Sequence, residues 1–189
     1  MLESRKLEHL RINLEEDVGF PRLTTGLERF FFVHRALPEI SLEDVELGTT
    51  FLGKHLRLPL LISSITGGTE EARRINYNLA AGAQATGIAM GLGSLRAALE
   101  SPRLADTFRV RSVAPDVLLF ANIGAAQLNA GFGPEECRRA IEITQADALI
   151  IHLNPLQEAL QADGNVNWRG LLPQIEQICR HLELPVLAK

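Results

Sequence analysis

The sequence is short of the residue types that mark several classes of protein. Its 189 residues include only two cysteines, Cys137 and Cys179. Their spacing suits neither a disulfide framework nor a zinc site, so we expect both to be reduced, packed thiols. No apolar run approaches the ~18 residues of a membrane-spanning helix, and charged residues occupy the N-terminus in place of a signal-peptide pattern. These absences predict a cytoplasmic protein with no membrane partner.

An excess of positive charge is also lacking. The formal net charge is −4, which argues against nucleic acid as the main partner. With 46% hydrophobic and 22% charged residues, the composition is that of a soluble globular protein. The length allows one ordinary domain but falls short of the roughly 250 residues that a complete eight-unit α/β barrel usually needs.

A repeat of apolar segments starts near residue 58. Five candidate buried strands, each followed by a polar loop, lie at residues 60–63, 87–90, 117–121, 148–151 and 185–188. Helical patterns at 70–85, 134–144 and 171–182 lie between them. Strands that alternate with helices at one period predict a parallel α/β sheet. We therefore expect residues 58–189 to form about the first five units of a (β/α)8 TIM barrel.

Residues 1–57 have a different pattern and are predicted to form an N-terminal arm and a segment that caps the barrel. Apolar residues 45–47 and 52–58 are expected to pair as a hairpin at one end of the barrel. Arg5, Lys6 and His9 lie near the start of the arm. They could form a clamp for an anion, or an ordinary solvated terminus.

Small or polar residues follow every predicted strand at its carboxyl end. In chain order they are Ser64, Thr66 and Gly67; Gly93, Ser94 and Arg96; Asn122, Gly124 and Gln127; His152, Asn154, Gln157 and Glu158; and Lys189. The carboxyl ends of parallel strands lie at the same edge of the sheet, and α/β barrels place their chemistry there. The pattern therefore predicts one shared ligand site at the barrel mouth.

Several of these residues suit an anionic ligand. Arg96 presents a planar fork for phosphate oxygens, although it could be a solvated charge. Glu158 could hold Mg²⁺ against a phosphate, or be an exposed glutamate in the first turn of a helix. Asn154 and Pro155 could instead form a plain turn, with His152 in the core. Lys189 ends an apolar strand, so we expect an anionic partner near it.

The residues at these strand ends closely resemble those of the type 2 isopentenyl-diphosphate isomerases. The similar segments are 5–9, 62–68, 93–96, 121–125, 152–158 and 185–189, in the same order over essentially the whole chain. The resemblance implies an FMN-dependent (β/α)8 barrel that interconverts isopentenyl and dimethylallyl diphosphate with reduced FMN and Mg²⁺. It also implies NADPH as the reductant and a homo-oligomer, either a tetramer or an octamer.

The resemblance also implies roles for individual residues. FMN would be held by Ile65, Thr66, Gly67, Ser94, Asn122 and Lys189, with Lys189 near the N1/O2 edge of the flavin. The diphosphate substrate would be surrounded by Arg5, Lys6, Ser94, Arg96, His152, Asn154 and Gln157. Gln157 and His152 are the candidate catalytic residues, Glu158 would hold Mg²⁺, and the N-terminal arm would act as a lid. The reduced flavin is expected to serve as acid and base, so no amino-acid general base is required.

The sequence departs from the family pattern at two places. Leu95 stands where the family usually has glutamine, and the sequence stops at the fifth strand. We therefore expect a fragment or an incompletely recorded polypeptide, unless another chain completes the barrel.

Two other functions are compatible with parts of the pattern. One is another FMN-dependent barrel, such as a hydroxy-acid oxidase, with a histidine base and a carboxylate substrate. That alternative leaves Gln157, Glu158 and the Arg5-Lys6 arm unexplained. The other is an inactive half-barrel that serves as an assembly module.

Overall fold

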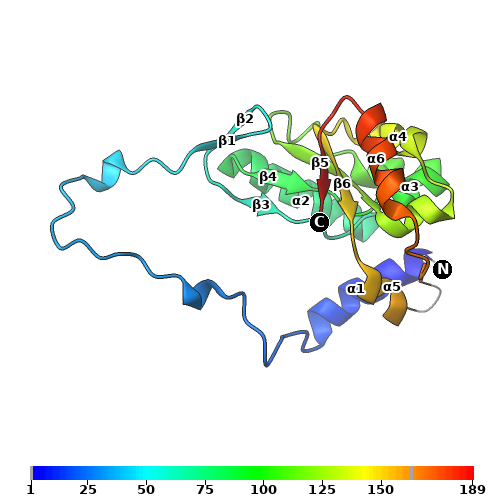
Figure 1. Cartoon of the computed structure of the whole chain (residues 1–189), viewed down its shortest axis with the longest axis horizontal. Helices are drawn as coiled ribbons and strands as arrows, with labels where there is room; N and C mark the ends of the chain where they lie inside the picture. The colour runs from blue at the N-terminus through cyan, green and yellow to red at the C-terminus, as the bar shows by residue number, and fades with distance from the viewer. Residues whose placement is uncertain (1, 162–163) are drawn as a thin grey trace.

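Five parallel strands form the main sheet of the computed structural model, which describes residues 2–161 and 164–189, with side chains from residue 7 onward. The strands pair in the order β3-β4-β5-β6-β7, so each lies beside the next one in the chain (Figure 1). Their bounds are Leu61–Ile62 (β3), Ala89–Gly91 (β4), Leu119–Gly124 (β5), Ala148–His152 (β6) and Val186–Ala188 (β7). Sequential parallel order is that of a barrel wall, whereas doubly wound sheets reverse their order. The predicted α/β sheet is confirmed.

The two central strands are the most buried part of the sheet. Every residue of β5 is buried, and so is every residue of β6 except His152. In the register of this pair, Gly124 lies opposite His152 and Asn122 lies opposite Ile150. The prediction of a strand buried on both faces is confirmed for residues 148–151. The register also places the polar ends of the two strands beside each other.

Three long helices pack outside the sheet at the predicted positions. They are α2 (Glu70–Thr86), α4 (Pro134–Thr144) and α6 (Leu171–His181). The side chain of Thr69 caps α2 by accepting a hydrogen bond from the Ala72 N–H, and Gly87 ends the helix with a positive φ of 69°. Glu136 caps α4 by accepting from the Gly133 N–H at 2.7 Å. Local capping therefore fixes the ends of these crossover helices.

The remaining connections are made of short elements that the sequence did not predict. Between β4 and β5 lie α3 (Arg96–Glu100) and the 3-10 helix η3 (Pro102–Phe108). The 3-10 helix η4 (Ala125–Ala130) follows β5, and α5 (Pro155–Leu160) follows β6. Phe108 and Phe120 are among the largest fully buried side chains, with Leu119 and Leu149 from the central strands. The core thus extends from the sheet to the helices that follow β4.

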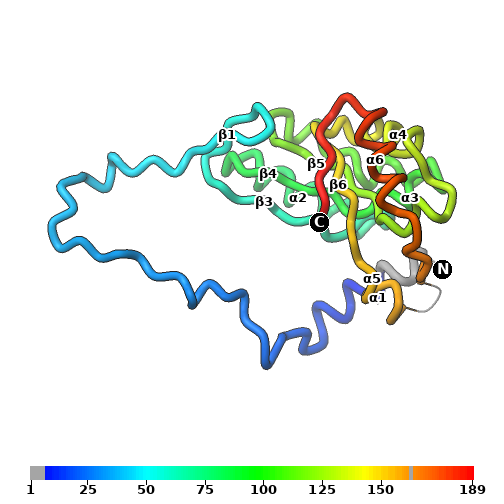
Figure 2. The backbone as a smooth tube through the Cα atoms, in the orientation of Figure 1, coloured from blue at the N-terminus to red at the C-terminus, as the bar shows by residue number. Residues whose placement is uncertain are grey.

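A long exposed stretch joins the first helix to the rest of the chain. Helix α1 (Leu2–Glu15) is followed by two 3-10 turns, η1 (Leu27–Arg29) and η2 (Leu42–Asp44), in a chain that loops away from the sheet (Figure 2). The apolar side chains of residues 30–33 are 79–103% exposed. His9 of α1 nevertheless lines the same cavity as Gln157 and Gln161 near α5. The first helix of the arm therefore lies at the carboxyl edge of the sheet.

The predicted hairpin exists, but its first strand was placed wrongly. The hairpin consists of β1 (Thr49–Phe51) and β2 (Lys54–Leu56), with Phe51 opposite Lys54. Leu52 and Gly53 both have positive φ, 49° and 79°, which is the conformation of a two-residue hairpin turn. Such a turn pairs the residues directly beside it, so residues 45–47 lie outside the hairpin.

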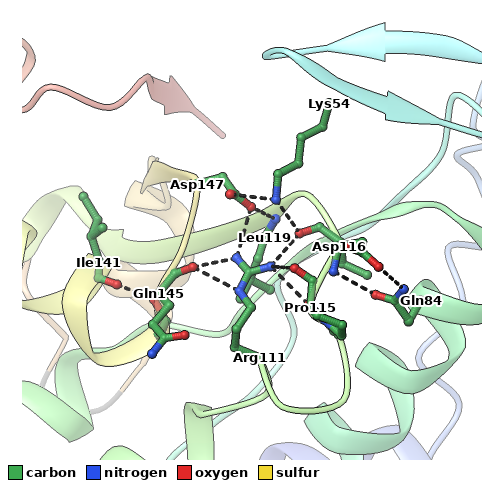
Figure 3. Close-up of polar contacts among 12 residues, drawn as sticks. Lys54, Gln84, Arg111, Pro115, Asp116, Leu119, Ile141, Gln145 and Asp147 are labelled. Atoms are coloured by element: carbon green, nitrogen blue, oxygen red, sulfur yellow. Dashed lines mark hydrogen bonds and ion pairs between the residues drawn. The ribbon is translucent and has the colours of Figure 1, made fainter.

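A network of charges joins this hairpin to the amino-terminal edge of the main sheet (Figure 3). Asp147, just before β6, lies 2.8 Å from the Lys54 ammonium and 3.1 Å from the Arg111 guanidinium. It also accepts a hydrogen bond from the Leu119 N–H at 2.8 Å. Burial opposes the charge of Asp147, but the Leu119 N–H, Lys54 and Arg111 outweigh it and hold the pKa of the carboxyl below its usual value.

The cysteines differ from each other. Cys137 is buried in α4, and burial raises the pKa of its thiol to about 12. Cys179 is exposed on α6, so the prediction of a packed thiol was wrong there. Successive residues of a helix point in different directions, so Ile178 faces the core while Cys179, the next residue, faces solvent. Within the described part of the chain, no helix is long and apolar enough to cross a membrane.

Asp147→Asn tests the network at the amino-terminal edge. Because the substitution removes the charge shared by Lys54 and Arg111, we expect the free energy of unfolding at pH 7 to fall by about 1–2 kcal/mol. The lowered pKa of Asp147 stabilises the fold above the unfolded-state pKa, and this gain is lost as pH falls through the folded-state pKa. The difference from wild type therefore shrinks below about pH 4. Urea unfolding at several pH values measures it.

Asp106→Asn is the matched control for this experiment. Asp106 pairs with Arg109 at 2.7 Å, but both side chains are mostly exposed. We expect this variant to stay within about 0.5 kcal/mol of wild type, as exposed pairs usually do. Equal effects of the two substitutions would contradict a structural role for the Asp147 network.

Candidate active site

A cavity of about 230 Å³ lies at the carboxyl ends of the parallel strands. Residues from all five strand ends line it, together with His9 of α1. The predicted site residues that line it are Ile65, Ser94, Arg96, Asn122, His152, Asn154, Gln157, Glu158 and Lys189. Sequential parallel pairing brings them together because it leaves every strand end at one edge of the sheet. The expectation of one shared cavity at the sheet edge agrees with this arrangement.

Two predicted residues, Thr66 and Gly67, do not line the cavity. Thr66 is only 4% exposed, and its carbonyl accepts a hydrogen bond from the Asn76 side chain at 3.2 Å. A Cβ on Gly67 would lie 1.9 Å from the ring of Phe108. Both residues hold the loop after β3 against its neighbours, and their predicted contact with FMN stays a prediction.

The basic residues of the arm are only partly described. Arg5 and Lys6 lie in the backbone of α1, and their side chains fall outside the described residues. His9 follows one turn later on the same helix and reaches the cavity. The structure therefore places the start of the arm at the site, whereas the predicted roles of Arg5 and Lys6 stay predictions.

Three buried polar atoms of the cavity lack a hydrogen-bond partner within the described residues. They are Ser64 Oγ, Asn122 Oδ1 and Asn154 Oδ1. Leaving such an atom unsatisfied costs about 1–3 kcal/mol, so native proteins rarely do so without a functional reason. Two further atoms of this kind, Asn165 Nδ2 and Trp168 Nε1, belong to residues outside the cavity lining, but the group of three around one cavity fits a polar ligand that would complete it.

Glu158 lies on the first turn of α5 and is only 8% exposed. Its Oε1 atom accepts a hydrogen bond from Asn154 Nδ2 at 3.0 Å, and its Oε2 atom accepts one from the Asn165 backbone N–H at 2.8 Å. The alternative of an exposed first-turn glutamate was therefore wrong. Each carboxylate oxygen keeps a further lone pair for a cation.

A dedicated all-protein metal site is absent among the described side chains, those of residues 7–161 and 164–189. No group of three or more His, Cys, Asp or Glu side chains in these ranges could hold an ion. Mg²⁺ is often held by one or two carboxylates together with substrate phosphates and water. Glu158 fits that mode of binding, in which the ligand supplies further oxygen atoms.

The two predicted cationic side chains of the strand ends are held differently. Arg96 is braced by an ion pair between its Nε atom and Glu100 Oε1 at 2.8 Å. Lys189 is positioned by its backbone, because its N–H donates to the Ile151 carbonyl at 3.0 Å and its own carbonyl accepts from Leu153 at 2.7 Å. Desolvation lowers the pKa of the Lys189 ammonium. A nearby anion would offset that effect.

The cavity also contains residues to which the resemblance gave no role. These are His9, Ser64, Gly93, Gly124, Gln127 and Gln161. Ser64 follows β3 closely, and Gln161 lies four residues after Gln157, the spacing that puts two side chains on one helical face. Both signals were present in the sequence. The contact of Gly93 is not local, because a Cβ there would lie 2.2 Å from the Thr66 carbonyl oxygen.

Comparisons with known proteins agree with this geometry. A family described as FMN-dependent dehydrogenase matches residues 1–103. The chain is 58% identical over 187 residues to a protein of Nostoc sp. (strain PCC 7120 / SAG 25.82 / UTEX 2576) named isopentenyl-diphosphate delta-isomerase, covering 99% of this chain and 53% of the relative. Proteins of the same name from Synechocystis sp. (strain ATCC 27184 / PCC 6803 / Kazusa) and Rickettsia prowazekii (strain Madrid E) are 57% and 54% identical over 185 residues, 98% of this chain and 53% and 54% of the relatives.

The chain spans about half the length of the curated relatives it matches. The similarity therefore covers the strand ends described above, and the activity of the whole protein is a separate question.

Gly93→Ala tests the close packing of the loops around the cavity. The new Cβ would meet the Thr66 carbonyl at 2.2 Å, so we expect the free energy of unfolding to fall by about 1–3 kcal/mol. Gly82→Ala is the control, because Gly82 lies within α2 with no atom in reach of its added Cβ. Alanine there is expected to stabilise the helix by about 0.5–1 kcal/mol. Urea unfolding of both variants measures the two changes in the free energy of unfolding, which we expect to have opposite signs. An unchanged free energy of unfolding in Gly93→Ala would contradict the close packing.

Proposed function

The chain belongs to the FMN-dependent dehydrogenase family, and we propose that the protein that carries it is an FMN-dependent isopentenyl-diphosphate delta-isomerase of type 2. The family fold is a (β/α)8 TIM barrel, and the five-stranded parallel sheet is consistent with part of one. One observation carries the proposal: buried groups suited to a flavin and a buried carboxylate suited to Mg²⁺ line the same cavity. The names of the relatives support it.

The residues of the cavity fit FMN. An isoalloxazine ring presents an N–H between two carbonyl oxygens, and Asn122 and Ser64 offer buried side-chain oxygens without partners among the described residues. Ile65, Ser94 and Lys189 line the same cavity. The ammonium of Lys189 would stabilise negative charge on the reduced ring. Thr66 and Gly67 would hold their loop in place beside it.

The other side of the cavity suits a diphosphate. Arg96 supplies a cation, Glu158 supplies an oxygen ligand for Mg²⁺, and His152, Asn154 and Gln157 supply polar groups between them. Arg5 and Lys6 are proposed to add positive charge from the arm, which would act as a lid that excludes water. His9 at the cavity supports that placement of the arm.

The proposed reaction moves a double bond without net oxidation. A proton is added to the terminal alkene carbon, another is removed from the allylic position, and positive charge develops between them. Reduced FMN, when bound, supplies an electron-rich ring and the groups that exchange these protons. The chain orients the substrate, and Gln157 and His152, the candidate catalytic residues, are proposed to surround it at its diphosphate end. Glu158 and Arg96 fix the diphosphate so that the hydrocarbon end is placed consistently.

Several wider properties belong to the same proposal. We infer NADPH as the reductant of the flavin, a cytoplasmic location, and a homo-oligomer of four or eight subunits, without nucleic acid as a partner. The hydroxy-acid oxidase alternative is supported only by the family description over residues 1–103. The isomerase name comes from relatives similar over 98–99% of the chain, which favours the isomerase.

An activity assay tests the proposal. We expect conversion of isopentenyl diphosphate into dimethylallyl diphosphate only when reduced FMN and Mg²⁺ are both present. Glu158→Gln is expected to lower kcat/KM at least about tenfold at limiting Mg²⁺, because a neutral amide is a poor ligand for a hard cation. Its FMN content is expected to match wild type. Oxidation of a 2-hydroxy acid instead, or loss of flavin in the variant, would contradict the proposal.

Asn122→Leu separates flavin binding from stability. Removing an unsatisfied buried amide oxygen is expected to leave the free energy of unfolding unchanged or slightly higher. The same change removes a proposed contact to FMN, so the Kd for FMN is expected to rise about tenfold. Flavin fluorescence quenching and urea unfolding measure the two effects. Unchanged FMN affinity would show that Asn122 does not hold the flavin.

A further inference from the structure

The side-chain amide of Asn154 lies between two other residues of the cavity. Its Nδ2 atom is 3.2 Å from Gln157 Oε1 and 3.0 Å from Glu158 Oε1. The second carboxylate oxygen of Glu158 is 2.8 Å from the backbone nitrogen of Asn165. The three side chains therefore form a chain of hydrogen bonds that begins at a backbone N–H.

The direction of these hydrogen bonds follows from the chemistry of the groups. The Asn165 backbone N–H can only donate, and the carboxylate of Glu158 can only accept. Asn154 must therefore turn its NH2 group toward Glu158. Because the same NH2 group also faces Gln157, that residue must turn its carbonyl oxygen toward Asn154.

Since the carbonyl oxygen of Gln157 accepts from Asn154, its NH2 group can donate a hydrogen bond into the cavity. We propose that Asn154 is a positioning residue, which passes the orientation imposed by Glu158 on to Gln157, so that Gln157 presents an N–H donor to an anionic ligand. The inference rests on the proposed function for the identity of that ligand, a magnesium-bound diphosphate. Gln157 thus donates to the ligand, and Asn154 affects ligand binding only by orienting Gln157.

The backbone near Asn165 secures the start of this chain. A Cβ on Gly164 would lie 1.8 Å from the backbone carbonyl oxygen of Glu158. Only glycine lets the chain approach closely enough for the Asn165 N–H to reach the carboxylate. The fixed donor thus depends on a residue with no side chain, which explains why sequence spacing alone did not indicate it.

The orientation of Gln157 matters for the charge of the ligand. An oxygen of Gln157 turned toward the cavity would repel phosphate oxygens, whereas an NH2 group donates to them. Asn154 Oδ1 faces away from both partners of its NH2 group and is buried without a hydrogen bond among the described residues. It remains an acceptor for a water molecule bound to Mg²⁺ or to the ligand.

Solvent exchange of side-chain amide protons, measured by NMR on 15N-labelled protein, tests the orientation directly. In wild type we expect the NH2 protons of Asn154 to exchange at least about tenfold more slowly than those of Gln157, because only the former are hydrogen-bonded within the chain. In Glu158→Gln, the new side chain must keep its oxygen for Asn165 and turn its NH2 group toward Asn154. Asn154 and Gln157 then reverse, so the NH2 protons of Gln157 become the protected ones.

Binding of magnesium pyrophosphate, measured by calorimetry, tests the consequence. Gln157→Glu keeps an oxygen for Asn154 but replaces the cavity-facing NH2 group with an oxygen, so we expect at least tenfold weaker binding. Asn154→Ala is expected to weaken binding several-fold through the lost orientation of Gln157. Gln177→Glu adds the same charge to an exposed position on α6 and is expected to bind as wild type does.

The two measurements fail in different ways. If wild type does not bind magnesium pyrophosphate but the exchange pattern reverses in Glu158→Gln, the positioning role of Asn154 stands and the proposed substrate is wrong. If the NH2 group of Gln157 is the protected one in wild type, the inference is overturned whatever the protein binds. Unweakened binding by Gln157→Glu would overturn the donor role of Gln157.

Discussion

Parallel pairing in sequential order is the constraint on which the rest of this structure depends. Every strand runs in the same direction beside the strand that precedes it, so all carboxyl ends lie at one edge of the sheet. The register of β5 with β6 sets Gly124 opposite His152, and that of β6 with β7 sets Ile151 opposite Ala188, next to Lys189. Residues from five strand ends, far apart in the sequence, therefore meet around one cavity.

Polar groups at one edge of the sheet are hydrogen-bonded, whereas some buried polar atoms at the other edge lack partners among the described residues. At the amino-terminal edge, Asp147 is fully engaged by Lys54, Arg111 and a backbone N–H, which ties the hairpin to the sheet. At the carboxyl edge, Ser64 and Asn122 carry buried atoms with no partner in the described ranges. A satisfied network stabilises the fold, whereas unsatisfied groups cost stability until a ligand binds. This contrast supports the proposed site at the carboxyl edge without reference to any relative.

Much of this could be predicted from the sequence because it depends on local pattern. The alternation of apolar strands with helices gave the sheet order, and residues just past each strand end had to face the same edge. What could not be predicted depends on contacts between distant segments. The carboxylate of Glu158 accepts a hydrogen bond from a backbone N–H seven residues later, and Gly67 packs against the ring of Phe108. The hairpin was misplaced because its turn begins at Leu52, a residue that rarely adopts positive φ.

We propose that one edge of the sheet binds both a flavin and a metal-bound diphosphate. A crystal structure of the protein with FMN, Mg²⁺ and pyrophosphate tests it most directly. We expect the flavin against Asn122 and Lys189, and the metal between Glu158 and the pyrophosphate, within one continuous cavity. Flavin or pyrophosphate bound at the opposite edge near Arg111, or an empty carboxyl edge in the presence of all three ligands, would contradict it.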